Sequence, residues 1–260
     1  MYEITPELKK KIIVLVKFSN SLDNLKSLQQ GNLYLNTLEF FRNQEIKLMK
    51  KGMGDDFEGR FILNDLNLKF YDNMNGNLIL EGKANQSSIT NQEDSEKHVL
   101  CTSYIDFSNL EIVQEKKESF TANIIFSDEE IKEFRENFGK YALVISLSDF
   151  KKNLEKNFRN QGIEAVSDKI SYNDFFKNHT NRIEPFINNT YEKYFWKDLY
   201  FKNQKEYRII ILNKDSKEPI IINIDDMSSY SFLTTASELF ENRFIIESYF
   251  DPKKDLVELE

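Results

Sequence analysis

The sequence contains very little cysteine and histidine. Its one cysteine, Cys101, cannot form an internal disulfide. Together with two histidines, His98 and His179, it supplies too few ligands for a structural zinc site. Cys101 lies in an apolar segment, where a thiol is usually unreactive. We therefore expect no metal site, no thiol catalysis and a reducing compartment, the cytoplasm.

Long apolar runs and an excess of positive charge are also missing. The apolar run at residues 12–16 is far shorter than the roughly 18 residues that suggest a membrane helix, so we expect no membrane span and no signal peptide. The formal net charge of -8 argues against bulk nucleic-acid binding, because phosphate backbones attract basic surfaces. A protein partner with a cationic surface fits this charge at least as well.

Glycine and proline are scarce, with 8 and 4 residues, whereas phenylalanine and tyrosine are abundant, with 22 and 12. A chain of 260 residues with this apolar content can bury a substantial core. No internal repeat and no linker rich in Pro, Gly or Ser divides it. We therefore predict one domain over residues 1–260.

Apolar periodicity predicts strands alternating with helices. A buried strand covers residues 12–16, a helix ends at Gly31, and "NLYL" begins the next strand. Asn75 and Gly76 predict a hairpin turn. Ser127 and Glu130 form a capping-box pattern, and Ser148 is the expected N-cap of a helix ending at Gly162.

Further along the chain the pattern predicts a helix near residues 183–195, a strand ending at 212 that forms a hairpin with "PIIINI", and a helix near residues 234–242. Residues 83–97 contain almost no apolar side chains and are predicted to form an exposed loop. Together these elements predict an α+β fold with mixed, largely antiparallel sheets and flanking helices.

The segment "GMGDDFEGR", residues 52–60, is the first candidate site. Its glycines surround Asp55, Asp56 and Glu58, and clustered carboxylates can contact a substrate or a divalent cation. The spacing does not match a known calcium loop. The alternative interpretation is an acidic surface turn solvated by water.

The segment "FKNQKEYRIII", residues 201–211, is the second candidate site. Because side chains alternate along a strand, Glu206 and Arg208 share one face and can act on one ligand. The alternative is an ion-pair face open to solvent. Just upstream, Trp196 and its aromatic neighbours either stack on a nucleobase or nicotinamide ring or pack in the core.

Three blocks give a family resemblance over roughly residues 12–212. They are a GxLY block in "GNLYLNTLEFFRNQE" followed by "GDDFEG", a CxS block in "VLCTSY", and "YFKNQKEYRIII". In this order they resemble an uncharacterised family of bacterial and phage proteins that is remotely similar to the ADP-ribosyltransferase fold. The resemblance implies NAD as the cofactor and Glu206 as the key carboxylate. It also implies Arg208 and Lys17 near phosphates, and Tyr34 or Trp196 against a ring.

Two functional hypotheses follow. The first is a non-catalytic protein of a bacteria and phage conflict system, either a phage inhibitor of a host defence complex or a defence subunit, that binds a partner protein. The alternative is an NAD-consuming, ADP-ribosyltransferase-like enzyme. An enzyme requires Glu206 in a concave pocket with aromatic and basic neighbours, whereas an interaction protein requires an exposed apolar or acidic patch. For the enzyme we expect Glu206→Gln to abolish NAD turnover without lowering stability.

Overall fold

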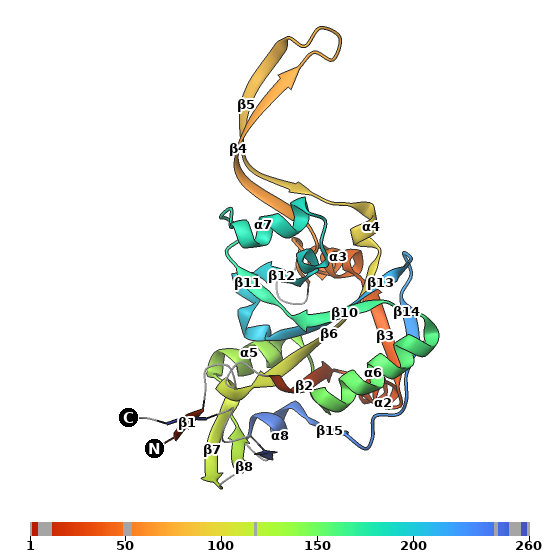
Figure 1. The fold of residues 1–260 in the computed structure, drawn as a ribbon, viewed down its shortest axis with the longest axis vertical. Coiled ribbons are helices and arrows are strands. Elements are labelled where there is room, and N and C mark those ends of the chain that lie inside the picture. The colour runs from red at the N-terminus through yellow and green to blue at the C-terminus, as the bar shows by residue number, and fades with distance from the viewer. Residues whose placement is uncertain are drawn as a thin grey trace.

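An antiparallel sheet runs through the middle of the molecule (Figure 1). The structure is a computed structural model that describes residues 2–4, 12–48, 54–116, 119–241, 244–249 and 256–258. Across the sheet the strands follow the order β10 (Ala165–Lys169), β13 (Glu206–Asp215), β6 (Lys97–Asp106), β2 (Ile12–Ser19), β9 (Tyr141–Ser146) and β15 (Ser231–Thr235). Two more strands, β3 (Asn32–Thr37) and β14 (Ile220–Asn223), extend it beside β6.

The sheet divides along one edge of β6, because β2 and β3 pair with different segments of this strand. β2 pairs with residues 103–106 of β6, and β3 pairs only with residues 98 and 99. β13 pairs continuously with β6 over residues 99–103. Between the ends of β2 and β3, residues 100–102 of β6 therefore lack a second strand partner in the described part of the chain. This split positions the candidate site.

Helices cover both faces of the sheet. On one face, α2 (Leu22–Gln29) and α6 (Leu147–Gln161) contribute Leu25 and Phe150 to a core that also contains Leu15 and Ile209. On the other face, α5 (Asp128–Asn137) and α8 (Ala236–Phe240) pack against β2 and β9. There Phe18 stacks on Phe134 with ring centroids 4.7 Å apart.

Local capping explains where several helices begin and end. The predicted capping box of Ser127 and Glu130 is confirmed at the start of α5. Gly31 follows α2 with φ 95°, and Gly162 ends α6 in the left-handed conformation. The prediction of Ser148 as N-cap is wrong: α6 begins two residues earlier, after Ser146, because Leu147 already packs against the core.

Residues 83–97 are mostly exposed, but the prediction that they form a loop is wrong. They continue β5 (Leu78–Ile89), pass through the short α4 (Gln92–Ser95) and begin β6. β5 pairs with β4 (Phe61–Tyr71) through a turn at Gly76, as predicted, and Figure 1 shows this hairpin projecting from the molecule. Polar composition misled the prediction, because residues 83–89 of β5 are mostly exposed and form a strand without apolar side chains to bury.

The predicted hairpin between the end of β13 and "PIIINI" is also wrong. β14 instead pairs with β3, where Ile222 lies opposite Leu33 and is buried in the core. The connecting segment is held by His98, whose two ring nitrogens each lie 2.9 Å from a carbonyl oxygen, that of Lys214 and that of Glu218. Long-range packing of Ile222 therefore determines the pairing.

The remaining described elements complete the molecule. They are β1 (Tyr2–Ile4), α3 (Leu38–Leu48), a 3-10 turn (Phe107–Asn109), β7 (Leu110–Glu115), β8 (Ser119–Ile124), β11 (Ser171–Asn173), α7 (Thr180–Ile187), a 3-10 turn (Tyr191–Phe195), β12 (Trp196–Asp198), a 3-10 turn (Leu199–Gln204), β16 (Ile245–Tyr249) and β17 (Leu256–Glu258). The helix predicted near residues 183–195 is therefore α7 followed by a separate 3-10 turn, because Asn189 adopts a positive φ of 51° between them.

The fold is α+β, with mostly antiparallel sheets and flanking helices in a single compact domain. β11 and β12 form a parallel pair. Within the described ranges, no helix has the length and apolar character needed to cross a membrane.

Candidate functional site

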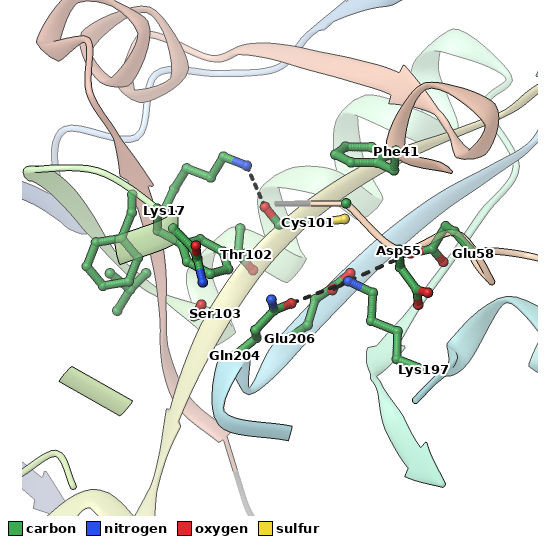
Figure 2. A pocket seen from close by; sticks show the side chains of 15 residues that line it. Lys17, Phe41, Asp55, Glu58, Cys101, Thr102, Ser103, Lys197, Gln204 and Glu206 are labelled. Atoms are coloured by element: carbon green, nitrogen blue, oxygen red, sulfur yellow. Dashed lines mark hydrogen bonds and ion pairs between the residues drawn. The ribbon is translucent and has the colours of Figure 1, made fainter. Parts of the chain in front are cut away.

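Segments that are far apart in the sequence meet at one cavity of about 170 Å³ (Figure 2). Lys17 enters from β2, Asp55 and Glu58 from the turn before β4, and Glu206 from the first position of β13. Phe41 of α3 lies across the cavity from Glu206. The structure thus brings the basic strand, the acidic turn and the Glu-Tyr-Arg strand together.

Arg208 holds the two glutamates of the cavity in place. Its side chain is only 1% exposed. Its Nε donates to Glu206 Oε1 at 2.8 Å, while Nη1 and Nη2 donate to the two carboxylate oxygens of Glu58 at 2.7 and 3.1 Å. Nη1 also donates to the Tyr194 carbonyl. The alternative of a solvent-open ion-pair face for Glu206 and Arg208 is therefore wrong, because both side chains are buried.

Glu206 is ionised and fixed by two cations. Besides the bonds from Arg208, its Oε2 lies 2.6 Å from Lys197 Nζ. Burial alone would raise the pKa of Glu206, but the charges of Arg208 and Lys197 outweigh burial and lower the pKa to about 2. The backbone N–H of Glu206 donates to the Tyr172 hydroxyl at 2.9 Å. This carboxylate can therefore stabilise a developing positive charge without a prior loss of a proton.

Lys197 is a site residue that the sequence analysis missed. Burial opposes its charge, but Glu206 and Glu58 raise its pKa above the usual value, so it remains an ammonium. Its Nζ also lies 3.4 Å from Gln204 Oε1, and Gln204 donates to Glu133 of α5 at 2.9 Å. The sequence carries no local signal for this lysine, because its position depends on the pairing of β12 with β11.

The acidic turn is built into the protein and is not the solvated loop of the alternative interpretation. Asp55 and Glu58 are each 2% exposed. Arg42 fixes the turn by donating to the Glu58 carbonyl at 2.8 Å and to Ser95 Oγ at 2.6 Å. Asp56 points away and lies 3.4 Å from Arg60. Residues 52 and 53 of the predicted segment lie outside the described residues.

Lys17 lies at the split in the sheet. Its Nζ donates to the Cys101 carbonyl oxygen at 2.7 Å, next to the part of β6 that neither β2 nor β3 covers (Figure 2). In the part of the chain that the structure describes, no carboxylate lies within ion-pair distance of this amine. Burial lowers the pKa of Lys17, and Cys101 and Glu206 offset the decrease only in part.

A second cavity, of about 570 Å³, shares a wall with the first. Lys17, Phe18, Phe41 and Cys101 line both cavities. Tyr34 of β3 lines only the second cavity and is 54% exposed. An elongated ligand can therefore contact the Glu206 cavity and the Tyr34 cavity on either side of Lys17.

Trp196 lies elsewhere. It lines a separate hollow of about 300 Å³ together with Asp168 and Tyr191. Because consecutive side chains of a strand point to opposite faces, Lys197 reaches the Glu206 cavity and Trp196 cannot. The ring-binding role expected for either Tyr34 or Trp196 therefore has structural support only at Tyr34.

The chemistry available at the cavity comes from ionisable side chains. Among the described residues, no group of three or more His, Cys, Asp and Glu side chains is arranged to hold a metal ion. Burial and the nearby Glu206 raise the pKa of the Cys101 thiol to about 12, so the thiol stays protonated. Comparisons with protein-family models, with curated proteins and with solved structures found no match to this chain.

Proposed function

We propose that the protein binds a nucleotide of the NAD class across the two neighbouring cavities and cleaves its bond to nicotinamide. The observation that supports this most is the position of Glu206, an ionised carboxylate in a cavity with the aromatic side chains Phe18 and Phe41 and with Lys17. An enzyme of this kind requires such a pocket around its carboxylate, whereas an interaction protein does not.

The proposed roles follow from charge and position. The nicotinamide end lies in the smaller cavity, where Glu206 stabilises the oxocarbenium-like state that forms as the glycosidic bond breaks. Lys17 contacts the pyrophosphate between the cavities, since a buried amine without a carboxylate partner takes up a proton and gains a counter-charge when the phosphate binds, whereas without the nucleotide burial favours its neutral form. The adenine ring stacks on Tyr34 in the larger cavity, whose volume of about 570 Å³ is typical of small-molecule sites.

Calorimetric titration with NAD tests the binding step. We expect saturable binding, and we expect Tyr34→Ala to weaken it by roughly tenfold, because stacking a base on an aromatic ring contributes about 1–3 kcal/mol. Tyr191→Ala is the matched control, since Tyr191 is 49% exposed and lines the separate hollow. No heat of binding at millimolar NAD, or equal losses in the two variants, would contradict the proposal.

Release of nicotinamide from NAD tests the chemical step. Wild-type protein should release nicotinamide, and Glu206→Asp should release it far more slowly, because the shorter side chain keeps the charge but withdraws the carboxylate from the cavity. Binding of NAD by the same variant provides the control for folding. If both proteins release nicotinamide at the same rate, Glu206 does not have this role.

The partner-binding hypothesis is supported by a different observation, the projecting β4–β5 hairpin. Leu68, Phe70 and Leu80 share one face of this ribbon, and Phe70 and Leu80 are 50% and 58% exposed. Lys69 and Glu81 form a 3.0 Å ion pair on the opposite face. Exposed apolar patches commonly mark interaction sites. As the second candidate function, this face binds a cytoplasmic partner protein in a bacteria and phage conflict system.

Affinity purification from host cells tests this second function. Phe70→Lys with Leu80→Lys should remove a partner that wild-type protein retains in stoichiometric amount, because the two charges interrupt the apolar face. Lys69→Ala with Glu81→Ala changes the opposite face of the same ribbon and should leave the partner bound. Equal recovery with both double variants would exclude the apolar face as the interaction surface.

A further inference from the structure

Lys17 differs from the other two cations at the Glu206 cavity. Arg208 and Lys197 are both paired with carboxylates, at distances of 2.7 and 2.6 Å respectively. Lys17 Nζ has one hydrogen-bond partner among the described residues, the Cys101 carbonyl oxygen at 2.7 Å. A carbonyl oxygen accepts a hydrogen bond from a neutral amine as well as from an ammonium, so this contact does not require a charge.

We propose that the Lys17 amine is a nucleophile that captures a small aldehyde or ketone in this cavity, reversibly and as an imine. The role proposed above for Lys17, contact with a phosphate, involves no covalent bond. The inference is independent of the proposed nucleotide site, since a protein that does not bind NAD can still trap a carbonyl compound.

The position of the amine supports this role. Lys17 lines both cavities, so a ligand in either cavity can reach its nitrogen. While one N–H donates to the Cys101 carbonyl, the lone pair of the neutral amine is available to a ligand. Phe18 and Phe41 also line both cavities and provide apolar walls for the substituent of a carbonyl compound.

The lowered pKa of Lys17 agrees with the lack of a carboxylate partner for its amine in the described structure. Burial lowers the pKa of Lys17, whereas paired carboxylates raise the pKa of Lys197 in the same cavity. At neutral pH a larger fraction of Lys17 is therefore the free amine, which is the nucleophilic form. The cavity thus contains one reactive lysine and one lysine held as an ammonium.

The reaction balances without an additional reactant. The Lys17 nitrogen attacks the carbonyl carbon, and the resulting carbinolamine loses water. A nitrogen–carbon double bond replaces the carbon–oxygen bond, and both protons of the neutral amine leave with that oxygen as water. Hydrolysis reverses each step and releases the carbonyl compound unchanged.

Reductive trapping on the full-length protein tests the inference. The protein is treated with a limiting amount of benzaldehyde and with cyanoborohydride at pH 7, and the modified lysines are then located by peptide mapping. We expect Lys17 to be labelled several-fold faster than Lys152, because burial lowers the pKa of Lys17 and so raises the fraction of its amine that is free. Lys152 is 75% exposed and serves as the internal reference. Lys197 should remain unlabelled.

Formaldehyde, a much smaller probe, separates nucleophilicity from access. If formaldehyde labels Lys17 ahead of Lys152 and benzaldehyde does so as well, the proposal is supported. If formaldehyde labels Lys17 no faster than Lys152, the amine is not activated and the proposal is wrong. If only formaldehyde prefers Lys17, the cavity does not accept the substituent of a larger carbonyl compound, and the proposed ligand site beside Phe18 and Phe41 is refuted. Lys17→Arg keeps a donor for the Cys101 carbonyl and should lose the preferential label.

Discussion

Replacing Glu206 with glutamine removes one charge from the buried cluster with almost no change in side-chain size. The carboxylate receives a 2.8 Å hydrogen bond from Arg208 on one oxygen and lies 2.6 Å from Lys197 on the other. Glutamine retains only one acceptor oxygen, and its NH2 group must face one of these two donors. The change therefore leaves a buried cation incompletely paired and places two donors against each other.

The expected cost is a large fraction of the stability of the protein. Removing one member of a buried ion pair typically costs about 3–5 kcal/mol. Arg208 keeps its bidentate contact with Glu58, so we expect the loss at neutral pH to fall near 3 kcal/mol. This differs from the sequence-based expectation that Glu206→Gln leaves stability unchanged, because that expectation did not include the buried contacts of Glu206 with Arg208 and Lys197.

Urea unfolding followed by circular dichroism measures the loss, with Asp225→Asn as the matched control. Asp225 lies 2.7 Å from Lys156, about as close as Glu206 lies to Lys197, but this pair is on the surface, where solvent screens it. The control should unfold near the wild-type urea concentration. If Glu206→Gln lowers the midpoint no more than Asp225→Asn does, the buried cluster does not stabilise the fold and the argument is wrong.

The pH dependence of the free energy of unfolding provides an independent check that ionised Glu206 stabilises the folded protein. The pKa of Glu206 is lowered from 4.5 to about 2 in the folded protein, so its stabilising effect is fully present above pH 4.5. The effect disappears as the pH falls from 4.5 through about 2, because over this range the unfolded chain binds a proton at this carboxyl while the folded protein does not. The stability difference between wild type and Glu206→Gln should therefore shrink over this range. A difference that is constant or grows toward low pH would contradict the assignment.

Two further predictions concern a glycine and the cysteine. Gly31→Ala should lower the stability measured by urea unfolding clearly more than Gly162→Ala does. Both glycines have a positive φ, which costs an alanine about 1–2 kcal/mol. Only at Gly31 would the new Cβ also meet backbone atoms, those of Ile224. Similar losses would refute the steric argument. Cys101 should react with iodoacetamide at pH 8 far more slowly than in urea-unfolded protein, because its pKa is raised to about 12; equal rates would contradict that shift.

Much of the fold could be predicted from local patterns. The capping box at Ser127 and Glu130, the turn at Gly76 and the helix stop at Gly31 each depend on residues within a few positions of one another. The pairing of β14 with β3 could not be predicted in this way. It depends on the burial of Ile222 opposite Leu33, a contact between segments far apart in the sequence. A hairpin was the natural prediction, because neighbouring strands usually pair.

The candidate site was predictable in part. Glu206, Arg208 and the acidic turn follow from strand alternation and from the glycines around the carboxylates. Lys197 was missed because a lysine beside a tryptophan gives no sign of burial, and its position depends on β12 pairing with β11. Asp56 was predicted as a site residue because it is adjacent to Asp55 and of the same type. Only the geometry of the turn shows that its side chain lies beside Arg60.

The arrangement of charges at the cavity itself argues for a ligand. Buried ion pairs often stabilise a fold less than apolar side chains of the same size would, and a cavity forfeits packing contacts as well. Buried ion pairs and a cavity occur together in this protein. Glu206 and Lys197 line the cavity, and Glu206 also pairs with the buried Arg208. Paired charges are rigid and cannot easily rearrange, whereas Lys17 is free of such a pair in the described structure and can respond to a ligand. A fixed carboxylate beside an adaptable amine is a combination that stability alone does not explain.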